Sequence, residues 1–368
     1  MSRRTGSANL PLHGGRAPAY LFSRMKQLAP EIVRLIVQEH GRDAFLAKIS
    51  DPYWFQALGC VLGFDWHSSG VTTTVCGALK EGLAPLASEL GIYVAGGKGK
   101  ASLRTPTELH EIGDRLGIDG AGLAYNSRMA AKVDSAAVQD GFGIYHHTFM
   151  VTADAKWTVI QQGMRPGDGM ARRYHWLGER VQDFVCEPHA AVASDAREQT
   201  VLNFVAREST AARSAVTELA RETPGRIDQE IARIITMQLP VRHWIDIKRD
   251  INPAHLRKVM ISTYEAAPPD FETLLALRGV GPAALRALSL VAEVVHGTPT
   301  SLRDPARFSF AHGGKDGHPH PVDRATYDHS IEWLREAAAR ARIGDTERTR
   351  ALRRLAEYHK PRNKTSQQ

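Results

Sequence analysis

The sequence predicts an α+β protein, with a mixed N-terminal domain around a central β-hairpin or small sheet and a mainly helical C-terminal domain. Two central segments, "GIYHHTFMVT" and "KWTVIQQGM", hold the densest aromatic and β-branched content and are joined by the short turn "ADAK", as in a hairpin. From about Asp195 onwards the apolar residues follow helical spacing almost throughout. We therefore expect a boundary near residue 190, with an α+β domain over 1–190 that carries any catalysis and a helical domain over 191–368.

The size and charge of the chain favour a two-domain protein with a polyanionic partner. The chain has 368 residues, which is longer than one typical domain. Hydrophobic residues make up 43% and charged residues 24%, as in ordinary globular proteins. The net charge is +7, which favours nucleic acid as the partner, although many cytosolic proteins are mildly basic.

The cysteine spacing and the lengths of the apolar segments indicate the cellular compartment. The three cysteines form no Cys-x-x-Cys pair, so neither a disulfide framework nor a structural zinc site is expected. No apolar run approaches the ~20 residues of a membrane span. The N-terminal segment "MSRRTGSANLPLHGG" lacks the apolar core of a signal peptide. These features predict a cytoplasmic protein without a membrane partner.

The N-terminal half begins with a Gly- and Pro-rich arm and continues as helices. Helical spacing before Gly41 predicts a helix that stops there, and Pro52 opens the next one. A third helix begins near Val71 and bends near Pro85. "GIYVAGGKGK" then reads as a strand entering a basic loop, and "TPTELHEIGDRLGI" as a helix. "RPGDGMARRYHWLG" is expected to be a loop.

The most informative motif is "FETLLALRGVGPAALRALSLVAEVVHG", within 270–297, which resembles a helix-hairpin-helix. Gly279 and Gly281 allow a tight turn, and Val280 between them is expected to pack inwards. The unpaired amides at the start of the second helix could bind a phosphate without reading sequence. Arg278 and Arg286 add positive charge. An ordinary helical turn with two glycines remains the alternative.

Further DNA contacts are expected from basic segments in both halves of the chain. "LHGGRAP" and "AHGGKDG" share a His-Gly-Gly-cation pattern that could cradle a phosphate. Arginines alternate with aromatic residues in "ARRYHWL", which suits phosphate binding and base stacking. "RTRALRRLAEYHKPRNK" reads as a basic C-terminal helix. The candidate contact residues outside the hairpin are His13, Arg16, Lys98, Lys100, Arg172, Arg173 and Lys315.

The central hairpin, with the acids before it and the polar pair at its end, resembles the core of a metal-dependent nuclease in outline. Asp134 and Asp140 precede it, and His146 and His147 open its first strand, where only one of the two can point into the core. Asp140 and His147 are therefore candidates for a metal-dependent nuclease using Mg²⁺ or Mn²⁺. "QQG" stands where such a nuclease would carry an acid and a lysine. Two further catalytic candidates, Asp65 and His67, precede a Ser- and Thr-rich helix start that binds anions or simply caps the helix.

The segment "PVDRATYDHSIEWL" resembles the catalytic segment of base-excision DNA glycosylases, with Asp323 in the place of their aspartate. A carboxylate there stabilises the cationic sugar or activates a water. More than forty residues separate Gly281 from Asp323, about twice the usual gap, and Ala283 stands where lyase-type members carry a lysine. The competing interpretation is that Asp323 is a helix N-cap. Nearby histidines could bind a metal or simply form a solvated loop.

Several segments together resemble the family catalogued as domain of unknown function 763. They are "RTGSANLPLHGGRAP", "WHSSGVTTT", "YHHTFMVT" with "KWTVIQQGM", "ARRYHWL", and "FSFAHGGKDG" with "PVDR". The resemblance covers nearly the whole chain and implies homology with bacterial and archaeal proteins, without implying a reaction.

The leading hypothesis is a DNA-binding protein of DNA processing or repair that contacts duplex, branched or single-stranded DNA. Within this hypothesis the protein could be a metal-dependent nuclease. The alternatives are a glycosylase-like enzyme that uses Asp323, a non-catalytic DNA-binding or scaffold module, and a hairpin that serves protein contacts only.

Overall fold

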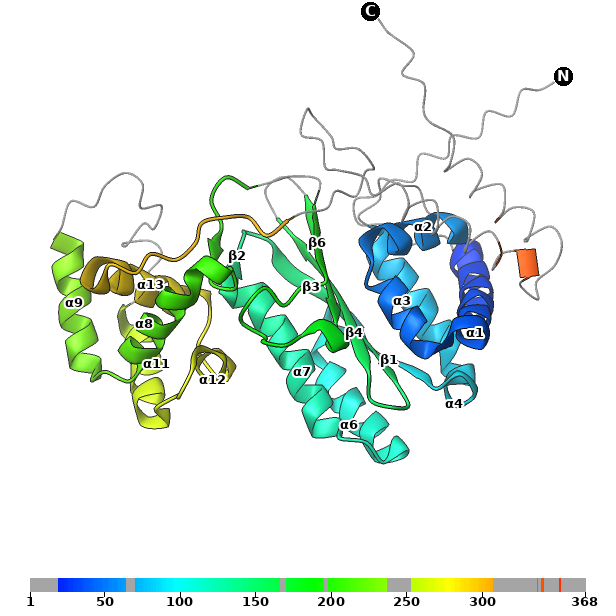
Figure 1. Ribbon diagram of the computed structural model, residues 1–368, viewed down its shortest axis with the longest axis horizontal. Helices are drawn as coiled ribbons and strands as arrows, with labels where there is room; N and C mark the ends of the chain where they lie inside the picture. The colour runs from blue at the N-terminus through cyan, green and yellow to red at the C-terminus, as the bar shows by residue number, and fades with distance from the viewer. Residues whose placement is uncertain are drawn as a thin grey trace, which may run out of the picture. The chain divides into compact units, whose positions relative to one another are not determined.

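A computed structural model of the protein describes residues 19–63, 70–165, 170–194, 198–236 and 253–306, with single positions at 336, 339, 340 and 351 (Figure 1). The predicted α+β class is confirmed, because helices and an antiparallel sheet both occur in the described chain. None of the described helices is long and apolar enough to cross a membrane.

The described residues fall into two compact units. The first comprises the described residues within 1–49, 53–94 and 321–368, and the second comprises those within 50–52 and 95–320. The boundary predicted near residue 190 lies inside the second unit, where it separates most of the sheet from the helices that follow. That boundary stays a prediction about domains, distinct from this division into units.

The first unit is helical and matches the predicted elements closely. Gly41 has a non-helical backbone (φ 85°), so the helix predicted to stop there changes direction and continues to Ile49. The bend predicted near Pro85 is a short 3-10 turn. The elements are α1 (Ala19–Ile49), α2 (Pro52–Leu62), α3 (Gly70–Leu83), η1 (Ala84–Leu86) and α4 (Ala87–Leu90).

The described strands form a five-stranded sheet in the order β1-β3-β4-β5-β6, and a two-stranded sheet, β2-β7. The predicted hairpin is confirmed: β3 and β4 are antiparallel, with His147 opposite Gln161. The strands are β1 (Ile92–Lys98), β2 (Val138–Gln139), β3 (Gly143–Thr152), β4 (Trp157–Met164), β5 (Ala171–Leu177), β6 (Ala191–Ser194) and β7 (Leu202–Asn203).

One sequence prediction about the sheet is wrong. The segment "ARRYHWL" was expected to be a loop, but it forms β5, every residue of which is buried. Its polar side chains are buried because partners distant in the sequence bind them, including Asp140 for Arg172. Local hydrophobicity could not reveal this strand.

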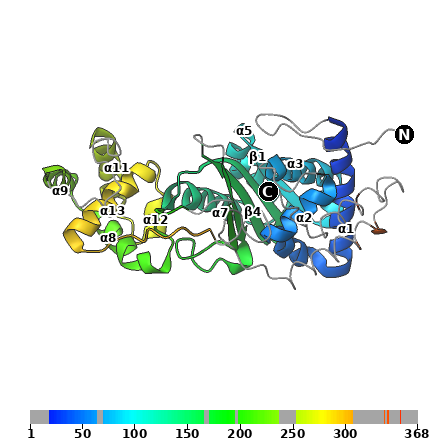
Figure 2. The same ribbon diagram turned by 90° about the horizontal axis from the view of Figure 1, so that it is seen from above.

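Helices α6 and α7 pack against the sheet (Figure 1), and Figure 2 shows α7 beside β4 in a second view. Helix α7 ends in a π-helical turn. Asp119 caps α7 by accepting a hydrogen bond from the amide of Gly122. Because α7 contacts both β3 and β4, its side chains reach the sheet face that carries His147 and Gln161. These elements are α5 (Lys100–Leu103), α6 (Thr105–Leu116), α7 (Gly120–Lys132) and the turn η2 (Val133–Ala137).

The later part of the second unit is mainly helical, as predicted, apart from β6 and β7. Phe204 stacks on Phe271 with 5.1 Å between ring centroids, which ties α12 to the segment after β7. The elements are η3 (Gly178–Arg180), η4 (Arg207–Ser209), α8 (Thr210–Ala220), α9 (Pro224–Thr236), α11 (Pro253–Ala266), α12 (Phe271–Ala276) and α13 (Pro282–His296).

Candidate functional site

Asp134, in the π-helical turn, is the centre of a buried hydrogen-bond network. Its side chain is fully buried. Its Oδ2 accepts hydrogen bonds from Gln161 Nε2 at 2.5 Å and from Trp176 Nε1 at 2.9 Å, and its Oδ1 lies 2.5 Å from His189 Nε2. Three donors from three different segments therefore hold one carboxylate in a single orientation.

His147 belongs to the same network and is linked to Asp134 through Gln161. Its Nδ1 is 2.8 Å from Gln161 Oε1, and its Nε2 is 2.9 Å from Ser127 Oγ. An amide oxygen only accepts, so His147 Nδ1 carries the proton and Nε2 accepts from Ser127. Burial lowers the pKa of His147, opposed by the bond to Gln161 and the charge of Asp134. Because His147 is buried, it positions Gln161 and does not meet a ligand directly.

His146 and His147 are both buried, which corrects the expectation that only one of them points into the core. They lie on opposite faces of β3, and the strand is buried on both sides at this point. His146 Nε2 is 2.9 Å from Thr148 Oγ1. Burial, with smaller contributions from His147 and Lys98, lowers the pKa of His146 to about 3.

Asp140 lies in a second buried cluster. Its Oδ2 accepts from Arg172 at 2.9 Å and from Tyr174 Oη at 2.5 Å, and Arg172 also makes a bidentate pair with Asp304 at 2.9 and 2.7 Å. Burial raises the pKa of Asp140, opposed by Arg172, Tyr174 and the amide of Phe142. The cluster joins the connection between β2 and β3, strand β5 and the segment after α13. A contact of Asp140 with a metal, or of Arg172 with DNA, would require this ion pair to open.

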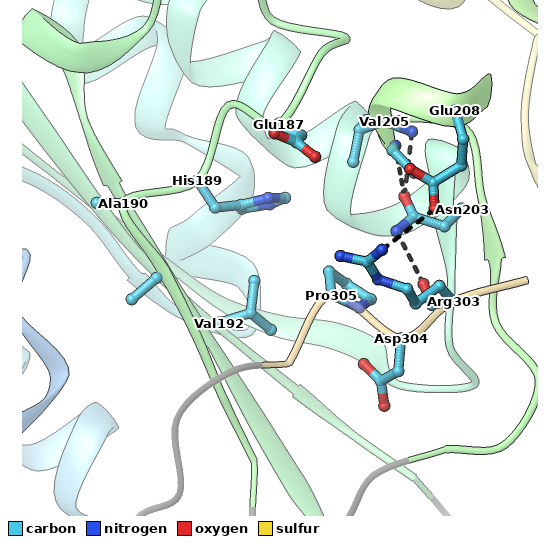
Figure 3. Close-up of a pocket in the computed structure, with 12 residues that line it drawn as sticks. Glu187, His189, Ala190, Val192, Asn203, Val205, Glu208, Arg303, Asp304 and Pro305 are labelled. Carbon is cyan, nitrogen blue, oxygen red and sulfur yellow. Dashed lines mark hydrogen bonds and ion pairs between the residues drawn. The ribbon is translucent and has the colours of Figure 1, made fainter. Parts of the chain in front are cut away.

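His189 lines a pocket of about 230 Å³ beside β6 (Figure 3). Its side chain is 7% exposed. Asn203 shapes the opposite wall, because its Oδ1 accepts from the amides of Val205 and Ala206 and its Nδ2 donates to Arg303 O. The lining residues are Glu187, His189, Ala190, Ala191, Val192, Asn203, Val205, Ala206, Glu208, Arg303, Asp304 and Pro305.

Two loose ion pairs between exposed side chains lie at this pocket. Glu208 of the lining pairs with Arg303 at 3.7 Å, and Glu187 pairs with Arg207 at 3.5 Å. The arginine side chains are 70% and 80% exposed, respectively, so these pairs hold them weakly. The guanidinium groups can therefore exchange a glutamate for a ligand anion.

The connection between α12 and α13 is a tight turn. Gly279 has φ 91°, which favours glycine, whereas Gly281 has an ordinary φ of −140°. Val280 is 1% exposed and Arg278 is exposed, as the sequence predicted. The two helices and their turn are thus present as expected, and their assignment as a DNA-binding helix-hairpin-helix stays a prediction.

The turn between α12 and α13 is held from one side by Lys132 and Gln139, which flank the π-helical turn η2. Lys132 Nζ donates to Leu277 O at 3.1 Å and to Val280 O at 2.6 Å, and Gln139 Nε2 donates to Pro282 O at 3.0 Å. Burial lowers the pKa of Lys132. The backbone of the turn is therefore anchored to the same segment that supplies Asp134.

The remaining sequence-predicted residues are scattered over the described chain or lie outside it. Lys98 and Lys100 are exposed at the end of β1, Arg286 is half-buried on α13, and Arg173 is buried with its Nε 2.8 Å from His175 Nε2. The residues outside the described ranges are His13, Arg16, Asp65, His67, Lys315 and Asp323, together with the basic C-terminal helix.

Sequence reasoning missed the pairing of Asp134 with His189. Both residues stood in polar segments of the sequence, but 55 positions separate them and no local pattern joins them. In the described parts of the chain, no three His, Cys, Asp or Glu side chains are grouped so that they could hold a metal ion. The Mg²⁺ or Mn²⁺ of the nuclease hypothesis therefore has no located ligand set.

The family model that matches the chain is described as "Protein of unknown function (DUF763)", and it covers residues 6–322. No curated protein and no solved structure matches the chain.

Proposed function

The chain belongs to the DUF763 family, and from its own residues we propose that it is a DNA-binding protein of DNA processing or repair. It would grip the sugar–phosphate backbone, without reading sequence, through the turn between α12 and α13. The partner would be duplex, branched or single-stranded DNA, and the compartment the cytoplasm.

The supporting observation is the one-sided anchoring of the turn. In a trans peptide the C=O and the following N–H point in opposite directions. Lys132 and Gln139 bind the carbonyls of Leu277, Val280 and Pro282, so the amides of Arg278, Gly281 and Ala283 point away from those side chains. Within the described chain these three amides have no hydrogen-bond acceptor.

Three outward amides beside an exposed arginine suit a phosphate oxygen. The helix that follows adds the positive end of its dipole, and Pro282 opens it at no loss of a needed amide. A Cβ built on Gly281 would meet nothing closer than Gly279 O at 4.0 Å, which leaves space for a close approach of the DNA backbone. The net charge of +7 supports the same partner.

Gly281→Asp tests this proposal. The added carboxylate would stand where the phosphate binds and repel it, while the fold has room for the side chain. We expect duplex binding, measured by fluorescence anisotropy, to weaken by about tenfold or more, with a shallower dependence on salt concentration.

Gly225→Asp is the matched control, since it makes the same charge change near the start of α9, where a Cβ meets no atom within 4 Å. It should bind DNA within about twofold of the wild type. Equal binding by both variants and the wild type would refute the role of the turn.

The class of chemistry is a separate proposal. A glycosylase would depend on Asp323 and tolerate a chelator, whereas a metal-dependent nuclease would lose activity in the chelator. A scaffold module would bind DNA without any turnover. The Asp134–His189 pair favours hydrolysis over the scaffold interpretation.

A further inference from the structure

We propose that His189, oriented by Asp134, is the general base of a phosphodiester-hydrolysing site in the pocket beside β6. This inference rests on the proposed DNA binding and names the reaction, the substrate bond and the residue that acts on it. It requires a base with a free nitrogen, a rigid support for that base, and cations that hold a phosphate.

The free nitrogen follows from the hydrogen bond to Asp134. An ionised carboxylate only accepts hydrogen bonds, so His189 Nε2 carries the proton that it shares with Asp134 Oδ1. Nδ1 then has the lone pair. No acceptor or donor for Nδ1 is found in the described parts of the chain, and the ring lines the pocket (Figure 3). A water molecule in the pocket can therefore donate to Nδ1.

The support for the base is rigid. The His189 ring meets the Trp176 ring edge to face at 4.6 Å between centroids, while the Trp176 Nε1 group donates to Asp134. His147 determines which way the Gln161 amide points, so that its NH₂ group must face Asp134. Base, carboxylate and their supports are thus oriented before substrate arrives, which lowers the barrier to proton transfer.

The cations are Arg303, which lines the pocket, and Arg207, which pairs with the lining residue Glu187. Both guanidinium groups are mostly exposed and only loosely paired with glutamates, as described above. A phosphate that approaches the pocket offers a stronger, bidentate partner than a glutamate at 3.5 Å or more. The apolar wall of Ala190, Val192 and Pro305 limits the water around the bound group.

The reaction is an ordinary hydrolysis. His189 Nδ1 takes a proton from water, the water oxygen forms a bond to phosphorus, and the phosphorus–oxygen bond to one sugar breaks. The leaving sugar oxygen takes a proton from solvent, and the imidazolium returns its proton to solvent. The products are a phosphomonoester and a free hydroxyl, and no electron is transferred.

The test compares wild type, His189→Gln and Arg303→Met on end-labelled single-stranded, duplex and branched DNA, read on denaturing gels. Reactions contain Mg²⁺, Mn²⁺ or a chelator. Gln can still donate to Asp134, so the fold should be kept, which thermal melting checks. His110→Gln is the matched control, because His110 is an exposed histidine on α6.

Cleavage should fall by about 10²-fold or more in His189→Gln, while DNA binding stays within about twofold. Arg303→Met should raise KM more than it lowers kcat, and His110→Gln should match the wild type. Wild-type protein that binds DNA but cleaves none of the substrates would overturn the inference and leave the proposed binding intact. So would undiminished cleavage by a folded His189→Gln. If the wild-type protein itself does not bind DNA, the proposed function is refuted instead.

Discussion

Asp134 and Asp140 are two buried aspartates on the same stretch of chain, and their partners differ in kind. Asp134 accepts from two neutral donors, Gln161 and Trp176, and from a histidine at a pocket. Asp140 binds Arg172, which in turn binds Asp304. In the Asp140 cluster one arginine is shared by two carboxylates and offers no basic nitrogen, whereas an aspartate that orients a histidine leaves a basic nitrogen available. Burial alone therefore does not distinguish an aspartate that supports a reactive group from one that supports the fold. The chemical nature of its partner makes that distinction.

The largest expected effect comes from breaking the Asp140 cluster. Arg172→Met should lower the free energy of unfolding by about 3–5 kcal/mol, because two buried carboxylates lose their counter-ion. Trp176→Phe, which removes one neutral donor from Asp134, should cost only about 1–2 kcal/mol. Urea denaturation of both variants measures the difference. Equal losses would show that the two aspartates are held alike.

A smaller effect concerns the two buried histidines of β3, His146 and His147. The pKa of His146 is lowered from 6.5 to about 3, and that of His147 is lowered too, so the unfolded chain binds more protons below pH 6.5. The contribution of the neutral histidines to the free energy of unfolding is therefore fully present above pH 6.5, and it is lost as the pH falls towards about 3. At pH 5 the loss from His146 alone is about 2 kcal/mol.

His146→Gln should remove part of this pH dependence, which denaturation at a series of pH values measures. His110→Gln, on the exposed surface, serves as the comparison and should change the slope little. An unchanged slope in His146→Gln would contradict the assignment of a neutral buried imidazole.

The smallest effects distinguish the two glycines of the α12–α13 turn. Gly279→Ala should cost about 1 kcal/mol of stability, because φ 91° strains any residue with a Cβ. Gly281→Ala should change stability by less than about 0.5 kcal/mol, since its backbone is ordinary and the space is open. Thermal melts measure both. A larger loss in Gly281→Ala would mean that this glycine serves the fold and not the approach of a ligand.

The sequence allowed the helices of the first unit, the β3–β4 hairpin and the α12–α13 turn to be predicted, because each depends on residues a few positions apart. It did not reveal β5. Arg172, Arg173 and His175 have polar side chains, which are typical of a surface. They are buried because groups distant in the sequence bind the arginines, including Asp140 for Arg172 and the Pro52 carbonyl for Arg173. The same limit applies to the site, because the sequence places Asp134 before the hairpin but gives no sign of its pairing with His189.

The sequence by itself determined the family, the α+β class and the local elements, since periodicity and turn residues act over one or two helical turns. Only the tertiary structure decided which polar side chains work together. Arg172 meets Asp304 across 132 positions, and Lys132 meets Val280 across 148. Such pairs form when packed elements bring them into contact in a medium of low dielectric constant, where an unpaired polar group is costly. An unpaired polar side chain costs free energy only where folding has buried it, so its partner is decided by the tertiary structure.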